Sequence, residues 1–257
     1  MITSPSNPTI KRIRQLQSRR KAREESRAFV IEGLRLVGEA AKTGAAVELV
    51  LHTDHLDGRG RALVNALARQ GATVETVSPS VMKVCSTAET PPGLLAVVPL
   101  PSLQPPGEAT LAVVVDGLSD PGNLGALLRT AMAAGVEVVF LTEGTVDAFN
   151  PKVVRSAMGA HFRLPIVELS PEALPNRLHG LEVWMAEAGG GVSYDRVNWR
   201  LPSALLIGGE AHGIRAEVRS LAKGQVSIPM PGEAESLNAS IAAAIILFEI
   251  VRQRGLT

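Results

Sequence analysis

Two polar side chains that could do chemistry lie on a helix predicted at residues 123 to 134. Asn123 begins this helix after a glycine-rich turn, and Arg129 follows six residues later, less than two full turns, so both can face one side of the helix N-terminus. One interpretation of Arg129 is an exposed arginine on the helix surface. However, the surrounding Leu, Ala and Met residues predict a largely buried helix, in which an unpaired guanidinium would be costly. Glu210, after a predicted strand that ends in Gly208 and Gly209, is the expected partner of Arg129.

Residues 228 to 254 combine an irregular loop with an apolar helix. The loop at 228–232, Ile-Pro-Met-Pro-Gly, holds two prolines and a glycine, so its backbone groups must find partners outside a regular ladder, a ligand among them. Ser236 is the expected N-cap of the next helix, with Asn238 in its first turn. Residues 241–250 are almost wholly apolar, which predicts a helix buried on most sides. By itself, the stretch fits a capped core helix as well as a ligand site.

The three stretches resemble, in order, the motifs of a known enzyme family. They read N-x-G-x-x-x-R-T-A at residues 123–131, I-G-G-E-x-x-G at 207–213 and I-P-M-x-G-x-x-x-S-L-N at 228–238. Their order and spacing are similar to those of the SpoU (TrmH) RNA 2'-O-ribose methyltransferases. The resemblance is strong over about residues 110 to 254 and looser before them.

The resemblance implies a cofactor and a set of site residues. The cofactor is S-adenosyl-L-methionine (AdoMet), and the family positions that touch it correspond to Gly208, Ile228 and Leu237, beside which we place Gly209 and Met230. The matching polar set around the ribose consists of Asn123, Arg129, Glu210, Ser236 and Asn238. Arg129 is the residue usually proposed to accept the 2'-hydroxyl proton. Because a guanidinium rarely loses its own proton at neutral pH, stabilising the alkoxide or an RNA phosphate is an open alternative.

The fold class follows partly from the residues and partly from the resemblance. The residues predict an α/β protein whose C-terminal part is a doubly wound parallel sheet, with a ligand at the C-terminal strand ends. The resemblance implies a trefoil-knotted sheet of the SPOUT type instead, in which the C-terminal stretch threads a loop and the knotted loops form the cofactor site. It also implies a homodimer whose C-terminal helix packs across the interface, although the apolar run equally suits a monomer core.

Other sites and compartments are disfavoured. The glycine spacing of dinucleotide and P-loop sites does not occur. His52 and His55 have no third ligand in view, and Cys85 is the single cysteine, so we expect no metal and no intrachain disulfide. There is no uncharged apolar run of about 18 residues, and the polar, basic N-terminus lacks the apolar segment of a signal peptide. We therefore expect a cytoplasmic protein without a membrane partner.

The first 27 residues form a basic arm. They hold eight Lys or Arg and two Glu, a charge of +6, whereas the whole chain carries +1, which leaves −5 for the rest. This asymmetry predicts a polyanionic partner; a solvated helix face is the alternative. The residues expected to bind RNA are Lys11, Arg12, Arg19, Arg20, Lys21 and Arg23.

The chain is predicted to hold two domains. Four prolines and a glycine at residues 99–109 predict an extended linker, placed at 101–109, between domains at 1–100 and 110–257. The smaller N-terminal α/β domain looks like the ribosomal-protein-like RNA-binding domain of many family members. For residues 1–100, we expect helices at 10–25 (capped by Thr9), 33–43, 60–70 and 81–86, and strands at 29–31, 47–51, 73–77 and 94–98. For residues 110–257, we expect strands at 111–115, 136–141, 164–168, 181–186 and 204–208, and helices at 123–134, 150–158, 171–179, 214–222 and from 241 to about 254.

These features predict a metal-independent, AdoMet-dependent RNA 2'-O-ribose methyltransferase. The two-domain order favours ribosomal RNA of the large subunit as the substrate. A tRNA 2'-O-methyltransferase is the alternative among enzymes. A non-catalytic RNA-binding or ribosome-assembly protein that retains the fold is the other alternative, although such a protein would not need the full polar set.

Overall fold

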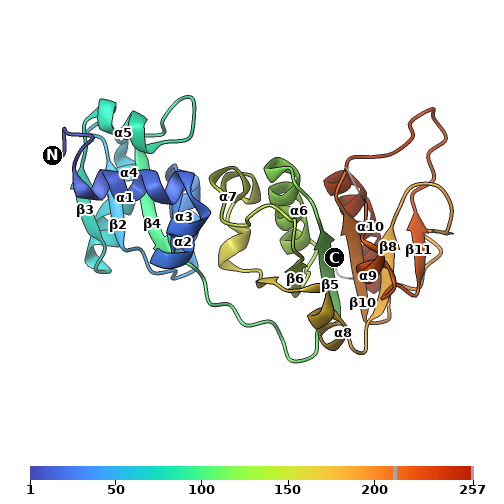
Figure 1. Ribbon diagram of the computed structural model, residues 1–257. Coiled ribbons are helices and arrows are strands. Elements are labelled where there is room, and N and C mark those ends of the chain that lie inside the picture. Colours follow the sequence, from blue (N-terminus) through green and yellow to red (C-terminus); the bar gives the residue numbers. More distant parts are fainter. Residues whose placement is uncertain (211–212, 256–257) are drawn as a thin grey trace. The chain divides into compact units, whose positions relative to one another are not determined.

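The computed structural model describes residues 1–210 and 213–255, and the chain forms two compact units (Figure 1). Unit 1 consists of Met1–Ser102 and Phe149–Phe162, and unit 2 of Leu103–Ala148 and Arg163–Thr257. The first division falls inside the predicted linker. The assignment of residues 149–162 to unit 1 was not expected from the sequence.

A four-stranded sheet forms the centre of unit 1, in the order β1-β4-β2-β3. β4 runs antiparallel to β1 and β2, whereas β2 and β3 run parallel. The strands are β1 (Ala28–Glu32), β2 (Leu49–His52), β3 (Thr73–Thr76) and β4 (Leu94–Pro99). The helices are α1 (Pro8–Ser18), α2 (Arg20–Ser26), α3 (Leu34–Lys42), α4 (Gly58–Arg69) and α5 (Pro79–Cys85).

Each face of this sheet carries its own hydrophobic core, because successive residues of a strand point to opposite faces. Val30 belongs to the core formed with α1 and α5, which includes Ile10. Phe29 belongs to the core formed with α3 and α4, and this core also takes in residues from segment 149–162. The rings of Phe29 and Phe149 lie edge to face, with centroids 5.0 Å apart. Segment 149–162 is therefore part of the packing of unit 1.

The single helix predicted at residues 10–25 is wrong. The structure has two helices that meet at Arg19, where the backbone is extended with φ −129° and ψ 120°. The N-cap of α1 is Asn7 rather than Thr9, since the Asn7 side chain accepts a hydrogen bond of 2.8 Å from the Thr9 backbone N–H. Arg23 is only 5% exposed and donates to the Leu16 carbonyl at 2.6 Å. This arginine ties α2 to the end of α1.

A seven-stranded sheet forms the centre of unit 2, and the structure gives it the order β7-β6-β5-β10-β8-β11-β9. All its neighbouring strands are parallel, which confirms the predicted parallel α/β class. The strands are β5 (Leu111–Asp116), β6 (Val138–Leu141), β7 (Ile166–Glu168), β8 (Glu182–Ala186), β9 (Val192–Ser193), β10 (Ser203–Gly208) and β11 (Gly224–Ser227). The helices are α6 (Pro121–Ala133), α7 (Pro151–Ala157, in unit 1), α8 (Leu174–Arg177), α9 (Ala216–Arg219) and α10 (Ala239–Arg254), with 3₁₀ turns at Ala160–Phe162 and Pro171–Ala173.

Several predicted elements of unit 2 differ from the structure. The helices expected at 171–179 and 214–222 are short, and strands β9 and β11 were missed because they are brief and mostly half-buried or exposed. The trefoil knot implied by the resemblance stays a prediction. Within the described residues, no helix is long and apolar enough to cross a membrane.

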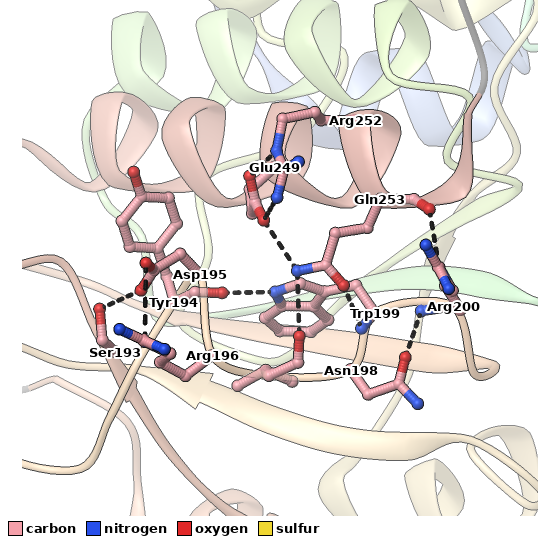
Figure 2. A network of polar contacts seen from close by, with 11 residues as sticks. Ser193, Tyr194, Asp195, Arg196, Asn198, Trp199, Arg200, Glu249, Arg252 and Gln253 are labelled. Atoms are coloured by element: carbon pink, nitrogen blue, oxygen red, sulfur yellow. Dashed lines mark hydrogen bonds and ion pairs between the residues drawn. The ribbon is translucent and has the colours of Figure 1, made fainter.

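The last turns of α10 are fixed by a polar network around Trp199, which is fully buried (Figure 2). The Trp199 ring N–H donates to the Tyr194 carbonyl at 2.7 Å. The Gln253 side chain of α10 accepts from the Trp199 backbone at 3.0 Å and donates to the Val197 carbonyl at 3.0 Å. These bonds hold the C-terminal end of α10, the helix whose N-cap is Asn238.

Candidate functional site

A cavity of about 250 Å³ lies at the C-terminal ends of β8, β10 and β11 in unit 2. All five residues that the sequence predicted for the cofactor line it, namely Gly208, Gly209, Ile228, Met230 and Leu237. Two of the predicted catalytic residues, Glu210 and Ser236, also line it. The cavity lies where ligands bind in parallel α/β sheets, beyond the carboxyl ends of the strands.

The rest of the wall was not predicted. It comes from strands β8, β10 and β11, from the segment after β8, from the residues before α9 and from the first turns of α10. Most of it is apolar: Ala186, Glu187, Ala188, Ile207, Gly213, Ile214, Val226, Ala239, Ala242 and Ile246. The sequence signal for the β8 segment was a strand followed by an acidic residue and three glycines. No motif pointed to it.

Gly208 and Gly209 are required by close approach of the backbone. A Cβ at Gly208 would lie 2.6 Å from the carbonyl carbon of Gly213, and a Cβ at Gly209 would lie 2.1 Å from the carbonyl oxygen of Gly117. Neither position has room for a side chain. The resemblance assigned Gly208 to a cofactor contact, whereas the structure shows that the neighbouring protein backbone also requires a glycine there.

An ion pair between a buried carboxylate and a partly exposed arginine supports the chain after Gly213. Asp116, at the end of β5, is fully buried and accepts from the Arg215 backbone N–H at 2.7 Å and from its guanidinium at 2.7 and 2.9 Å. Thr142 also donates to this carboxylate. Burial alone would raise the pKa of Asp116, but the hydrogen bonds from Arg215 and Thr142 together lower it. Asp116 therefore holds the chain after Gly213 against the end of β5.

A chain of side-chain hydrogen bonds joins the three motifs. The Asn123 amide donates to Glu210, and the Asn123 carbonyl accepts from the Asn238 amide at 2.9 Å. Asn123 itself is placed in the first turn of α6, where the Asp120 carboxylate caps its backbone N–H at 2.8 Å. Asn123 and Asn238 do not line the cavity, but they are connected to its wall through Glu210.

The helix start predicted at Ser236 is wrong. Asn238 is the N-cap of α10, and its side-chain oxygen accepts from the backbone and hydroxyl of Ser240 at 3.0 and 2.7 Å and from the Ile241 backbone at 3.3 Å. Both polar atoms of the Asn238 side chain are thus engaged: the oxygen accepts from the first turn of α10, and the nitrogen donates to Asn123. Ser236 is exposed in the loop before the helix and lines the cavity.

Arg129 differs from its prediction in two ways. It is exposed on α6, whereas Leu127 and Leu128 beside it are buried. In residues 1–210 and 213–255, no hydrogen bond or ion pair joins Arg129 to Glu210, whose carboxylate accepts from Asn123 instead. Arg129 therefore presents its charge to solvent. It does not line the cavity.

The site contains no candidate metal centre in the part of the chain that the structure describes, since no three His, Cys, Asp or Glu side chains gather there with suitable geometry. Cys85 lies in unit 1, and burial raises its pKa to about 11. Its thiol is therefore protonated at neutral pH.

Comparison with known proteins identifies two protein-family matches in this chain. Residues 110–248 match the SpoU rRNA Methylase family, and residues 7–96 match the MRM3-like substrate binding domain. The chain is similar to the 23S rRNA (guanosine(2553)-2'-O)-methyltransferase RlmP of Bacillus subtilis (strain 168). The two are 32% identical over 251 residues, which cover 97% of this chain and 98% of RlmP.

Two solved structures with bound cofactor resemble both units. The AdoMet-bound rRNA methyltransferase from Sinorhizobium meliloti has a TM-score of 0.85 and 32% identity, covering 98% of this chain and 97% of that one. The SpoU methyltransferase AviRb from Streptomyces viridochromogenes, in complex with AdoMet, has a TM-score of 0.88 and 29% identity, covering 96% and 98%. Since the family match spans more than half of the chain and its motifs meet around one cavity, the protein belongs to the SpoU rRNA methylase family.

Proposed function

We propose that the protein transfers the methyl group of AdoMet to a ribose 2'-hydroxyl of ribosomal RNA, with large-subunit RNA as the substrate. One observation carries this proposal. The bonded chain from Glu210 through Asn123 to Asn238 connects the cavity wall with the N-termini of two helices. A ribose that approaches this chain would meet amide and carboxylate groups whose positions are already fixed, as transfer between two bound groups requires.

The cavity suits AdoMet in shape and charge. Its volume of about 250 Å³ is close to the lower end of the range, roughly 300 to 1,000 Å³, found for small-molecule pockets. Ile228, Leu237 and other apolar side chains offer flat contacts to an adenine ring, while Glu210 gives the wall a negative charge. That charge complements a sulfonium. We propose Gly208, Gly209, Ile228, Met230 and Leu237 as its binding residues.

The chain's own residues would position the acceptor and balance its charge. AdoMet, when bound, supplies an electrophilic methyl group. We propose that Asn123, Glu210, Ser236 and Asn238 orient the ribose through hydrogen bonds, with Glu210 held in place by Asn123. Arg129 is exposed and keeps its positive charge at neutral pH. In this proposal, it stabilises the negative charge that develops on the ribose oxygen or an adjacent phosphate.

Ribosomal RNA is favoured over tRNA by the N-terminal part of the chain. Residues 7–96 match a substrate binding domain named for an rRNA enzyme, and RlmP, which matches nearly the whole chain, is named for 23S rRNA. We propose residues 1–100 as the RNA-binding domain, 101–109 as the linker and 110–257 as the methyltransferase domain. With this substrate, the expected compartment is the cytoplasm.

The basic arm of unit 1 offers a surface for RNA. Lys11, Arg19, Arg20 and Lys21 are exposed on α1 and α2 or between them, and we propose that they contact phosphates. Surface pairs with acidic residues do not remove them from this role, since exposed pairs contribute little. Arg12 is paired with Glu48 at 2.7 Å and Arg23 is buried. For Arg12 and Arg23, a role in holding the helices in place is better supported than direct contact with RNA.

A homodimer is the proposed assembly. Ile241 and Phe248 on α10 are 52% and 51% exposed, and residues seven apart lie on one side of a helix. Large exposed apolar side chains on an otherwise buried helix favour a protein partner. A second copy of α10 would cover them.

The proposed function is tested with methyl-labelled AdoMet and three unmodified RNAs: large-subunit RNA, small-subunit RNA and tRNA, each digested to nucleosides after reaction. Label in a 2'-O-methyl nucleoside of large-subunit RNA is expected. Arg129→Ala should lower turnover by about 10²-fold or more while its AdoMet affinity changes little, and Arg177→Ala, which removes an exposed arginine of α8, should behave like the unmodified protein. Label confined to tRNA would overturn the assignment of ribosomal RNA as the substrate. AdoMet binding without any labelled RNA or ribosomal precursor would favour the RNA-binding alternative.

A further inference from the structure

Glu187 is an acidic residue of the cavity wall that does not belong to the hydrogen-bonded chain around Asn123. It follows β8 directly, and its backbone N–H donates to the Val226 carbonyl of β11 at 3.1 Å. Its carboxylate accepts two hydrogen bonds from the Arg219 guanidinium at the end of α9, one of them 2.8 Å long. Both the backbone and the side chain are therefore held before any ligand arrives.

The loop after Glu187 is equally constrained. Gly191 has φ +75°, and a Cβ there would lie 2.5 Å from the Gln225 carbonyl oxygen. The Gln225 side chain donates to the Gly189 carbonyl at 3.1 Å. The segment after Ala188 is consequently held against β11 and continues into β9, which leaves Glu187 and Ala188 in the wall at the end of β8.

The chemistry of this carboxylate favours hydroxyl groups as its ligand. Hydrogen bonding to Arg219 lowers the pKa of Glu187, so the group is ionised at neutral pH and can only accept hydrogen bonds. Each oxygen that receives one N–H of the guanidinium fork still has lone-pair capacity for a second donor. Because Arg219 already compensates the negative charge and would repel another cation, neutral donors fit better than an ammonium group.

We propose that Glu187 accepts hydrogen bonds from the vicinal hydroxyl groups of the AdoMet ribose, with Arg219 as the residue that positions it. This inference rests on the proposed function, because it assigns one end of the same cofactor cavity. In this proposal, the two glutamates of the described cavity wall have different ligands. Glu210 faces the acceptor ribose through Asn123, and Glu187 holds the ribose of the cofactor.

The test compares S-adenosylhomocysteine with its 2',3'-dideoxy analogue by isothermal titration calorimetry. The unmodified protein is expected to bind the parent compound about tenfold or more tightly than the analogue, since hydrogen bonds to a charged group are among the stronger ones. Glu187→Gln should lose most of this preference, because parent binding weakens while binding of the analogue changes little. Comparing the two ligands across the two proteins isolates the contact.

Glu182→Gln is the matched control, since Glu182 begins β8, the strand that Glu187 follows, and pairs with a basic residue, Lys223, but does not line the cavity. This variant should keep the full preference. Arg219→Met, which removes the positioning group and leaves Glu187, should reduce the preference without abolishing binding. An undiminished preference in Glu187→Gln, or none in the unmodified protein, would overturn the inference while AdoMet binding stands. Failure of the unmodified protein to bind S-adenosylhomocysteine would overturn the cofactor proposal itself.

Discussion

Asn123 donates its side-chain amide to the carboxylate of Glu210, although the two residues lie 87 positions apart in the sequence. The same amide group accepts a bond from Asn238, 115 positions away. Asn123, at the start of α6, thus contacts both the loop after β10 and the start of α10 through its side chain. In the proposed reaction, its first role is to hold other groups in place.

Replacement of Asn123 by alanine should therefore reduce turnover more than cofactor binding. The variant loses both amide bonds, leaving Glu210 and Asn238 free to move, and an error in position of about 1 Å can lower a rate about 10²-fold. We expect a fall of that order in kcat, with an AdoMet Kd changed less than about threefold. Single-turnover methylation and calorimetry measure the two quantities. Asn198→Ala, which removes an exposed amide far along the chain, serves as the control; an equal loss in both variants would contradict the assignment.

Much of this fold could be predicted because its elements follow local patterns. The buried strands β5 and β10 are continuous apolar runs, and the structure places their ends within one residue of the predicted ones. Segment 149–162 could not be assigned to unit 1 in this way. Its place depends on packing between Phe149 and Phe29, which are far apart in the sequence.

The site was predictable where glycines and polar residues fall into ordered motifs. It was unpredictable where contacts between residues distant in the sequence determine the geometry. Nothing in the sequence shows that Asp116 forms a salt bridge with Arg215, 99 positions later. Arg129 was expected to be buried because its neighbours are apolar. The buried positions of α6 follow the helical repeat, however, and Arg129 falls on the exposed side.

Asp116→Asn should destabilise unit 2 in a pH-dependent way. The substitution removes a buried charge paired with Arg215, whose side chain is 36% exposed, so we expect a loss of about 2 kcal/mol, below the value for a fully buried pair. Since folding lowers the pKa of Asp116 below 3.8, its ionisation stabilises the protein at neutral pH, and this contribution is lost as the pH falls through 3.8 and below.

Urea unfolding of the Asp116→Asn variant at a series of pH values measures this effect. The difference in free energy of unfolding from the unmodified protein should be largest near neutral pH and should shrink towards pH 3, because protonated aspartate resembles asparagine. Asp54→Asn, at an exposed position of unit 1, should show little difference at any pH. A difference that stays constant across the series would mean that packing, and not charge, determines the loss.

Phe248→Glu should convert the proposed dimer into a monomer. The side chain is half exposed in one copy, so a charge is tolerated there by the monomer, but it would be buried without a partner in a dimer interface. Light scattering coupled to gel filtration should give twice the chain mass, 27.1 kDa, for the unmodified protein and the single mass for the variant. Val84→Glu changes an exposed apolar residue of unit 1 and should leave the dimer intact. If the unmodified protein is a monomer, the proposed homodimer is refuted.

Removal of two exposed charges, Lys11→Ala with Arg19→Ala, should weaken RNA binding through phosphate contacts. Each lost contact lowers the slope of log K against log salt by roughly 0.7 to 0.9, so the double variant should show a slope smaller by about 1.5 and a Kd raised several-fold at moderate salt. Filter binding to a large-subunit RNA fragment across a salt series measures both. Arg59→Ala with Arg69→Ala, which removes two exposed charges from α4, is the matched control. Equal slopes for the two double variants would show that net charge attracts the RNA and that α1 and its junction with α2 form no specific contact.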